Sequence, residues 1–301
     1  MRYFEWRGEK ISQMVLGTAQ LGMNYGIANK TGQTDECEAI AILSSALDQG
    51  INMIDTAQGY GNSELVIGKW LASNTPARNH VQVISKLNLS NEELNTKQFQ
   101  ERVMVSTKNI GGSLWGMMLH SEELLNELDK IQDQVYLCKK EGLFNYFGVS
   151  IYTVEAAKKA IEMEDIDFIQ VPSNAWDSRM VKEGVFDLAE KRDKLCFIRS
   201  VFLQGLLLMP ASEAKKKLPA SYEVAKEWES YATEKKSSKT QLAFEYVSQF
   251  ERPLVVGVDN VMQLKNNMDT FISNRYNTIH KENFSPDKMP EIVVSPQLWS
   301  C

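Results

Sequence analysis

Eight short apolar runs, rich in β-branched residues, constrain the fold of this 301-residue chain more than any other feature. Longer segments with helical periodicity separate them, and this alternation is typical of βα units that build a parallel sheet. Eight such units favour a closed (β/α)8 TIM barrel of the α/β class, although an open parallel sheet fits the same alternation. The predicted strands are residues 14–19, 51–57, 81–87, 114–120, 146–151, 167–173, 195–202 and 253–258.

The segments between these strands are predicted to contain the barrel helices. Several open with a capping residue such as Ser121 or Thr153. No Pro/Gly/Ser-rich linker and no long internal repeat interrupts the sequence, so we expect one domain over residues 1–301. A short N-terminal segment at 1–13 and a C-terminal extension at 275–301 flank the barrel. The predicted helices cover 36–49, 97–109, 122–140, 153–163 and 180–192.

Composition excludes several classes of partner. The 33 basic and 39 acidic residues give a net charge of −6, which argues against a nucleic-acid-binding surface. No apolar run approaches the roughly 20 residues that span a bilayer, and the N-terminus lacks the apolar core of a signal peptide, so we expect a cytoplasmic protein without a membrane partner. The four cysteines form no CxxC pair and the three histidines are not at ligand spacing, so no metal site is predicted.

Four ionisable residues fall at the ends of three successive predicted strands. Asp55 ends the second strand and Tyr60 follows it in MIDTAQGYGNSE, while Lys86 and His120 end the third and fourth strands. Because the carboxyl ends of barrel strands meet at one mouth, these side chains are expected to converge there. Singly, each has a structural explanation, such as a loop cap for Asp55 or a satisfied core histidine for His120. Their joint placement at one mouth of the predicted barrel indicates a catalytic site.

The chemistry that suits them is protonation of a carbonyl oxygen while a hydride reaches its carbon. A tyrosine with a pKa near 10 is a reluctant acid, and the ammonium of Lys86 is expected to move the pKa of Tyr60 toward neutrality. Asp55 would keep the buried lysine charged. His120 would donate a hydrogen bond to the carbonyl and orient it.

The sequence resembles the aldo-keto reductases, a family of (β/α)8-barrel enzymes that reduce aldehydes and ketones with NADPH and without a metal. DTAQGYGNSE resembles the family's DTAxxYGxSE block, and LGTAQLG, ISK and MLH resemble its first, lysine and histidine strands. FGVS, IQVPSN, RSVFLQGLL and VVGVDNVMQLKNN follow in the family's order. The resemblance implies an oxidoreductase whose catalytic tetrad is Asp55, Tyr60, Lys86 and His120, with Tyr60 as general acid.

The same resemblance implies three sets of coenzyme contacts. They correspond to the nicotinamide carboxamide, the pyrophosphate and the adenosine, and the helix after the last strand would offer backbone N–H groups to a phosphate. Structural alternatives stay open, such as a strand-edge bond for Gln170 and a turn for Gly205. In that order the implied contacts are Ser150, Gln170 and Asn174; Ser200, Leu203 and Gly205; and Gly257, Asp259, Gln263 and Asn267.

Two positions depart from the family pattern. Arg199 stands where many members carry an aromatic residue that stacks on the nicotinamide, and its planar guanidinium can stack but adds charge. Asp259 stands where many NADPH-using members have a basic residue, and a carboxylate repels a 2′-phosphate and accepts bonds from a ribose hydroxyl. Lys265 can still supply a cation, so NADP(H) is favoured slightly over NAD(H) on family grounds.

The loops after the first and sixth predicted strands offer Asn24, Tyr25 and Trp176, which suit a small-molecule carbonyl such as a sugar or another hydroxylated carbonyl. GTAQLGMNYGI and RSVFLQGLLLM also resemble a bacterial subgroup associated with sugar or surface-polysaccharide metabolism. We expect a monomer or small homo-oligomer.

The alternative function is a barrel that binds nicotinamide nucleotide as a sensor or regulatory subunit without significant turnover. A Rossmann dehydrogenase is disfavoured, because GTAQLG does not supply the GxGxxG motif after the first strand.

Overall fold

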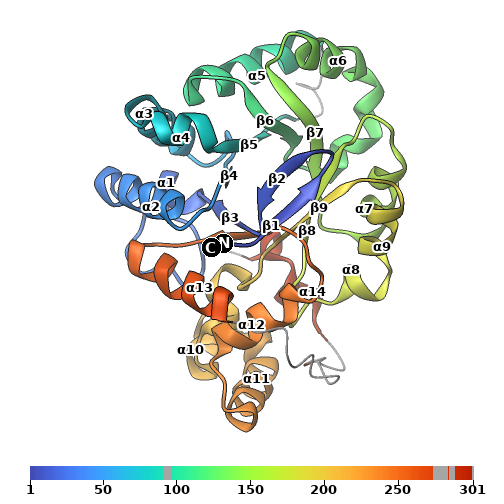
Figure 1. Cartoon of the computed structure of the whole chain (residues 1–301). Coiled ribbons are helices and arrows are strands. Elements are labelled where there is room, and N and C mark those ends of the chain that lie inside the picture. Colours follow the sequence, from blue (N-terminus) through green and yellow to red (C-terminus); the bar gives the residue numbers. More distant parts are fainter. Residues whose placement is uncertain (91–95, 274–283, 285–288, 300–301) are drawn as a thin grey trace.

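The computed structural model describes residues 1–90, 96–273, 284 and 289–299, and its centre is a closed barrel of parallel strands (Figure 1). The barrel closes where the last strand pairs with the first, with Gly257 opposite Gly17. The predicted (β/α)8 barrel is therefore confirmed, and the open sheet is excluded. The barrel strands are β3 (Met14–Gly17), β4 (Met53–Asp55), β5 (Gln82–Leu87), β6 (Leu114–Leu119), β7 (Phe144–Ser150), β8 (Phe168–Pro172), β9 (Leu195–Arg199) and β10 (Leu254–Gly257).

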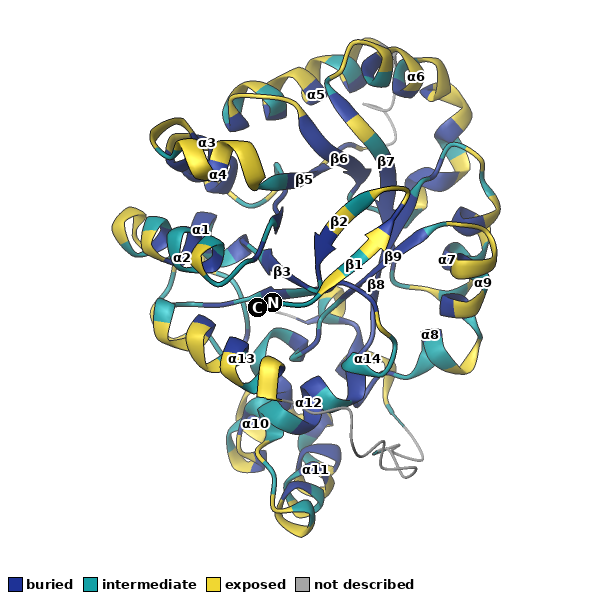
Figure 2. Cartoon of the chain, in the orientation of Figure 1, coloured by how far each residue is buried: buried dark blue, intermediate teal, exposed yellow. Residues whose placement is uncertain are grey.

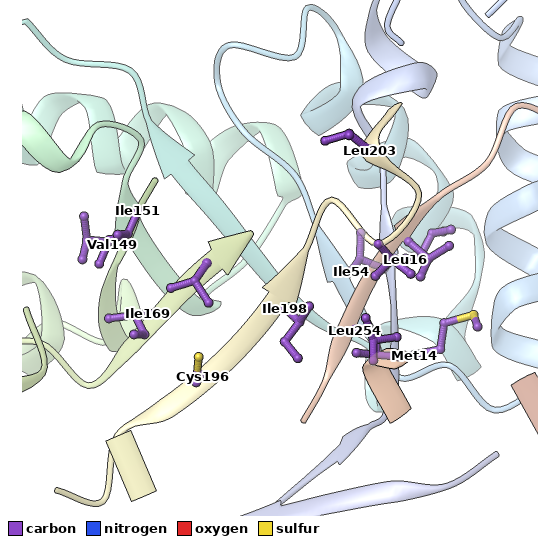
Figure 3. Close-up of a cluster of buried hydrophobic side chains, with 14 of the residues drawn as sticks. Met14, Leu16, Ile54, Val149, Ile151, Ile169, Cys196, Ile198, Leu203 and Leu254 are labelled. Atoms are coloured by element: carbon purple, nitrogen blue, oxygen red, sulfur yellow. The ribbon is translucent and has the colours of Figure 1, made fainter. Parts of the chain in front are cut away.

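Alternate residues of each strand pack on opposite faces of the barrel wall. On β9, Cys196 and Ile198 lie in one apolar cluster with residues of the neighbouring strands, such as Ile169 (Figure 3). The same cluster contains side chains of the surrounding helices. Leu195 and Phe197, which alternate with them, belong to a second cluster inside the barrel. Because both faces are buried, the strands read as continuous apolar runs, as parallel strands do. Polar side chains are therefore conspicuous where the strands end.

Helices surround the barrel and present buried faces to it and exposed faces outward (Figure 2). The prediction for 180–192 is wrong in one respect, because Gly184, at φ +68°, separates two helices. The prediction for 122–140 likewise becomes a 3-10 segment followed by a helix. The bounds are α1 (Ala19–Gly22), α2 (Glu36–Asp48), α3 (Ser63–Ser73), α4 (Thr75–His80), α5 (Thr96–Ile110), η1 (Glu122–Lys130), α6 (Gln132–Lys140), α7 (Val154–Glu162), α8 (Arg179–Lys182), α9 (Val185–Lys191), η2 (Leu203–Leu208), α10 (Ala211–Lys217), η3 (Pro219–Ser221), α11 (Tyr222–Lys235), α12 (Lys239–Ser248), α13 (Val261–Ser273), α14 (Glu291–Val294) and η4 (Pro296–Leu298).

The N-terminal segment forms an antiparallel hairpin of β1 (Tyr3–Trp6) and β2 (Glu9–Ser12) that lies across one end of the barrel (Figure 1). Trp6 is buried, and its ring centroid lies 4.9 Å from that of Tyr146 and 6.1 Å from that of Trp115. These partners lie near the amino ends of β6 and β7. The hairpin thus covers the amino ends of the strands and leaves the carboxyl ends for a site.

The predicted division into a segment at 1–13, a barrel and an extension at 275–301 stays a prediction. Most of 275–301 lies outside the described residues, apart from Phe284 and the stretch that contains α14 and η4. Within the described ranges, no helix has the length and apolar character needed to cross a bilayer.

Candidate active site

A cleft of about 840 Å³ opens at the carboxyl ends of the barrel strands. Asp55, Tyr60 and His120 line it, and Lys86 lies behind Asp55 with 1% of its surface exposed. The structure thus brings together the four ionisable residues predicted from β4, β5 and β6 and the loops that follow them.

Asp55 is the centre of a buried polar cluster. Its Oδ2 accepts a hydrogen bond from Nζ of Lys86 at 2.5 Å, and its Oδ1 accepts one from Nε2 of Gln170 at 2.7 Å. Nζ of Lys86 also lies 3.3 Å from the carbonyl oxygen of Thr56. Burial lowers the pKa of Lys86 and Asp55 opposes that shift. The carboxylate therefore stabilises the charged lysine, as the sequence predicted.

Close backbone contact holds Tyr60 beside this cluster. Gly61 has φ +55°, and a Cβ on Gly61 or on Gly22 would collide with the backbone of the other segment. The close contact explains Gly22 in LGTAQLG, and the contact together with the left-handed conformation explains Gly61 in GYG. The Tyr60 ring centroid lies 5.1 Å from Nζ of Lys86 and 5.8 Å from the His120 ring, which meets it edge to face.

The pKa of Tyr60 is raised rather than lowered, primarily by burial and then by the negative charge of Asp55. The expectation that Lys86 moves the pKa of Tyr60 toward neutrality is therefore wrong, because burial is the largest cause of the shift and the negative charge of Asp55, whose Oδ2 lies 2.5 Å from Nζ of Lys86, acts in the same direction. The consequence is a phenol that keeps its proton at neutral pH. A protonated Tyr60 is the form that carbonyl reduction requires of a general acid.

His120 is neutral at ordinary pH. Burial lowers its pKa from the usual 6.5 to about 3, and the positive charges of Lys86 and Arg199 act in the same direction. A neutral imidazole has one N–H donor, which suits hydrogen bonding to a carbonyl oxygen without competing for the proton.

The depressed pKa of His120 predicts an acid-sensitive contribution to stability. The unfolded chain protonates this residue below pH 6.5 and the folded chain only near pH 3, so stability falls as the pH drops through that window. Between pH 7 and 5, urea denaturation should show that His120→Gln loses about 1–2 kcal/mol less than the wild type. His80→Gln, at an exposed histidine, is the control. Equal losses in the wild type and His120→Gln would contradict a buried neutral imidazole.

Most of the residues implied as coenzyme contacts lie on the cleft. Two do not: Leu203 is fully buried in the core, and Asn174 is fully buried with Nδ2 donating to the carbonyl oxygen of Ser200 at 3.0 Å. Asn174 therefore fixes the loops around the cleft without lining it. The implied contacts that do line it are Ser150, Gln170, Arg199, Ser200, Gly205, Gly257, Asp259, Gln263 and Asn267.

Gly205 has a local reason to be glycine. Its φ is +87°, and a Cβ there would collide with the side chain of Ala28 from the loop after β3. That loop meets the segment after β9 over the cleft: the amide of Ala28 donates to the carbonyl oxygen of Gln204 at 3.3 Å, and Lys30 forms an ion pair with Glu213 at 2.8 Å. Both segments line the cleft, so the turn at Gly205 also shapes it.

The amino end of α13 differs from the expectation that it offers free amides to a phosphate. The amide of Val261 donates to Oε1 of Glu38 at 2.8 Å, and the amide of Gln263 donates to Oδ1 of Asn260 at 2.9 Å. Asp259 also accepts a hydrogen bond from the Gln263 side chain at 3.2 Å. Two carboxylates therefore lie at a helix end that the sequence suggested as an anion site.

Of the three predicted substrate residues, only Tyr25 lines the cleft. Trp176 is 2% exposed and belongs to the apolar core, and Asn24 lies outside the cleft lining. Asn24 and Trp176 therefore do not line the cleft, although Tyr25, on the same loop as Asn24, does. Tyr152 and Asn29 also line the cleft, although neither was predicted as a site residue. Tyr152 follows β7 by two residues, so the strand-end rule was able to find it.

Within the part of the chain that the structure describes, no group of three or more His, Cys, Asp or Glu side chains is arranged to hold a metal ion.

Eight parallel strands close into a barrel, and Asp55, Tyr60 and His120 line a cleft at their carboxyl ends. A sequence model of the Aldo/keto reductase family matches residues 13–279, so the chain belongs to this family. The family's general activity is NAD(P)H-dependent reduction of small-molecule carbonyls.

Relatives in sequence and structure agree with this assignment. The chain is 25% identical over 286 residues to D-arabinose 1-dehydrogenase of Saccharomyces cerevisiae, covering 87% of this chain and 83% of that protein. It is 27% identical over 209 residues to aldo-keto reductase YhdN of Bacillus subtilis, covering 66% of this chain and 61% of that protein. The fold matches the holo form of aldo-keto reductase AKR11C1 from Bacillus halodurans with a TM-score of 0.72 at 21% identity over 90% of each chain. It also matches glycerol dehydrogenase AKR11B4 from Gluconobacter oxydans, with a TM-score of 0.68 at 19% identity over 89% of this chain and 90% of that one.

Proposed function

We propose that this protein reduces an aldehyde or ketone with a nicotinamide coenzyme and that Tyr60 is the general acid. The observation that carries the proposal is the position of Tyr60 on the cleft, with its ring centroid 5.1 Å from Nζ of a buried lysine that is itself paired with Asp55. Neutral His120 lies at the same end of the cleft.

The residues along the cleft fit a dinucleotide. The lining runs from Tyr60 to Asp259 at the amino end of α13, with glycine backbone at Gly205 and Gly257. A Cβ at Gly257 would collide with the side chain of Gln20, which also lines the cleft. Ser150 and Gln170 supply polar groups near Asp55 for the carboxamide. When bound, the nicotinamide supplies the hydride.

The four ionisable residues then have distinct roles. The Tyr60 hydroxyl donates its proton to the carbonyl oxygen, and the N–H of His120 donates a hydrogen bond to the same oxygen. Lys86 stabilises the phenolate that remains on Tyr60. Asp55 holds the lysine in its charged form and does not touch the substrate.

We propose a sugar or another hydroxylated carbonyl as the substrate class. Tyr25 and Tyr152 add phenolic hydroxyls to the cleft lining close to the catalytic end. The names of two similar proteins, a D-arabinose 1-dehydrogenase and a glycerol dehydrogenase, support polyhydroxylated substrates for this part of the family.

For the coenzyme, the family pattern slightly favoured NADP(H), and the environment of Asp259 shifts our proposal to NAD(H). Asp259 lines the cleft, and the carboxylate of Glu38 caps the amide of Val261 beside it. Lys30, a cation on the lining, is already paired with Glu213. A 2′-phosphate would meet these carboxylates, whereas a ribose hydroxyl can donate to them.

Asp259→Asn tests this preference. Removing one charge at a partly exposed site should lower the Kd for NADPH by about tenfold and change the Kd for NADH by less than about threefold. Asp269→Asn removes an exposed charge from α13, the helix that begins just after Asp259, and should change neither Kd. If Asp259→Asn leaves the ratio of the two Kd values unchanged, Asp259 does not face the 2′ position.

The reductase proposal as a whole is tested by titrating the protein with NADH and NADPH. Quenching of its six tryptophans reports binding, and the same preparation is then assayed against a panel of aldehydes and sugar carbonyls. We expect binding together with coenzyme oxidation on a hydroxylated carbonyl. Binding without oxidation on any carbonyl would instead favour the nucleotide-sensing alternative, and failure to bind either nucleotide would overturn both.

A further inference from the structure

Arg199, at the end of β9, carries a charge that the proposed catalytic steps do not use. Its Nη2 donates to the carbonyl oxygen of Ile151 at 2.9 Å, and its Nη1 donates to Oγ of Ser200 at 3.1 Å. Its guanidinium carbon lies 4.0 Å from the centroid of the Tyr152 ring. Three contacts from two strand ends therefore hold the guanidinium at a fixed place on the cleft.

None of the ion pairs of the described residues includes Arg199, and its Nε is buried without a hydrogen-bond partner. The other charges at this end of the cleft compensate each other, because Lys86 is paired with Asp55 and His120 is neutral. The positive charge of Arg199 opposes the rise in the pKa of Tyr60 and adds to the fall in the pKa of His120, so its field reaches both residues. This end of the cleft therefore carries one uncompensated positive charge.

Such a charge distinguishes the two forms of a nicotinamide coenzyme. The oxidised ring is a cation, whereas the reduced ring is neutral, and the two forms otherwise carry the same phosphates. For a hydride to reach a carbonyl held by Tyr60 and His120, the ring must lie at the end of the cleft that Arg199 also lines. Repulsion in this largely buried environment raises the free energy of the oxidised form alone.

We propose that Arg199 makes this site bind the reduced coenzyme more tightly than the oxidised one, so that the site fills preferentially with the reduced form and releases the oxidised form more readily. The inference rests on the proposed function, since it concerns the same cleft. It assigns Arg199 a role that a stacking aromatic residue at this position would not have, because an aromatic ring contacts both forms of the coenzyme without a net charge.

The test measures Kd for NADH and NAD⁺ by tryptophan quenching in the wild type and three variants. We expect the wild type to bind NADH about tenfold more tightly than NAD⁺, the size of one partly screened charge interaction at a few ångströms. Arg199→Gln keeps a donor for the Ile151 carbonyl and removes the charge, so the ratio should fall toward one. Arg199→Lys should keep most of the ratio. Arg192→Gln, which removes an exposed arginine at the end of α9, should leave it unchanged.

The outcomes separate the two proposals. Equal affinity of the wild type for NADH and NAD⁺ overturns the role of Arg199 whether or not the variants fold. An unchanged ratio in Arg199→Gln, with native circular dichroism and retained binding, also overturns it and leaves the reductase proposal intact. If Arg199→Gln and Arg199→Lys both bind NADH and NAD⁺ with equal affinity, the preference of the wild type comes from the shape of the arginine side chain and not from its charge, which overturns the proposal. Failure of the wild type to bind either nucleotide removes the proposed function and this inference together.

Discussion

The Tyr60→Phe variant is expected to lose about 10³-fold in kcat while its Kd for the reduced coenzyme changes by less than about threefold. Tyr60 lies on the cleft, and its raised pKa keeps the phenol protonated at neutral pH. Phenylalanine keeps the aromatic ring at this position, so the substitution removes only the proton donor. Steady-state turnover and tryptophan quenching on the same preparation measure both quantities. A loss of binding equal to the loss of turnover would mean that Tyr60 serves the coenzyme and not the proton transfer.

Tyr25 provides the matched comparison, because its ring centroid lies 6.3 Å from that of Tyr60 and burial also raises its pKa. Tyr25→Phe should raise KM for a hydroxylated substrate and leave kcat within about threefold of the wild type. If the two variants exchange these effects, Tyr25 is the proton donor and our assignment of the tetrad is wrong.

The Lys86→Met variant is expected to lose both activity and stability. Without the ammonium, the phenolate form of Tyr60 loses its stabilising charge, and kcat should fall by about 10²- to 10³-fold. Asp55 is 2% exposed and would lose its only ion-pair partner among the described residues, so urea denaturation should show a loss of about 3–5 kcal/mol.

The double variant Asp55→Asn/Lys86→Met separates the two effects. An asparagine at position 55 still accepts the hydrogen bond from Gln170, which in the wild type measures 2.7 Å, but needs no counter-ion. The double variant should therefore recover most of the stability and none of the activity. Full activity in the single Lys86→Met variant would contradict the coupled action of Asp55, Lys86 and Tyr60.

The fold was predictable because its constraints are local and repeated. Both faces of each strand are buried, so β6, for example, reads as the uninterrupted apolar run LWGMML. Polar residues at the strand ends then identify the site, which is why Asp55 and His120 were recognised from their positions. The N-terminal hairpin was not predicted, because Trp6 is held by Trp115 and Tyr146, more than 100 positions away.

The direction of side chains within the loops could not be predicted from the sequence. Asn174 and Trp176 occur on a loop after β8, but contacts with distant segments decide which way they point. Nδ2 of Asn174 donates a hydrogen bond to the carbonyl oxygen of Ser200, and Oδ1 of Asn174 accepts one from the backbone amide of Trp176 at 2.9 Å. The direction of the Tyr60 pKa shift was missed for a related reason, since it depends first on how deeply the folded chain buries the phenol and then on how close Asp55 lies to it.

The most direct test of the central claim is mass spectrometry of the alcohol formed from a hydroxylated aldehyde with coenzyme deuterated at C4 of the reduced ring. The account predicts one deuterium at the new carbinol carbon, transferred from the coenzyme, and none at that carbon when the label is supplied in the solvent. Product whose carbinol hydrogen comes from water, or no product over any member of the carbonyl panel, would contradict a hydride-transferring reductase.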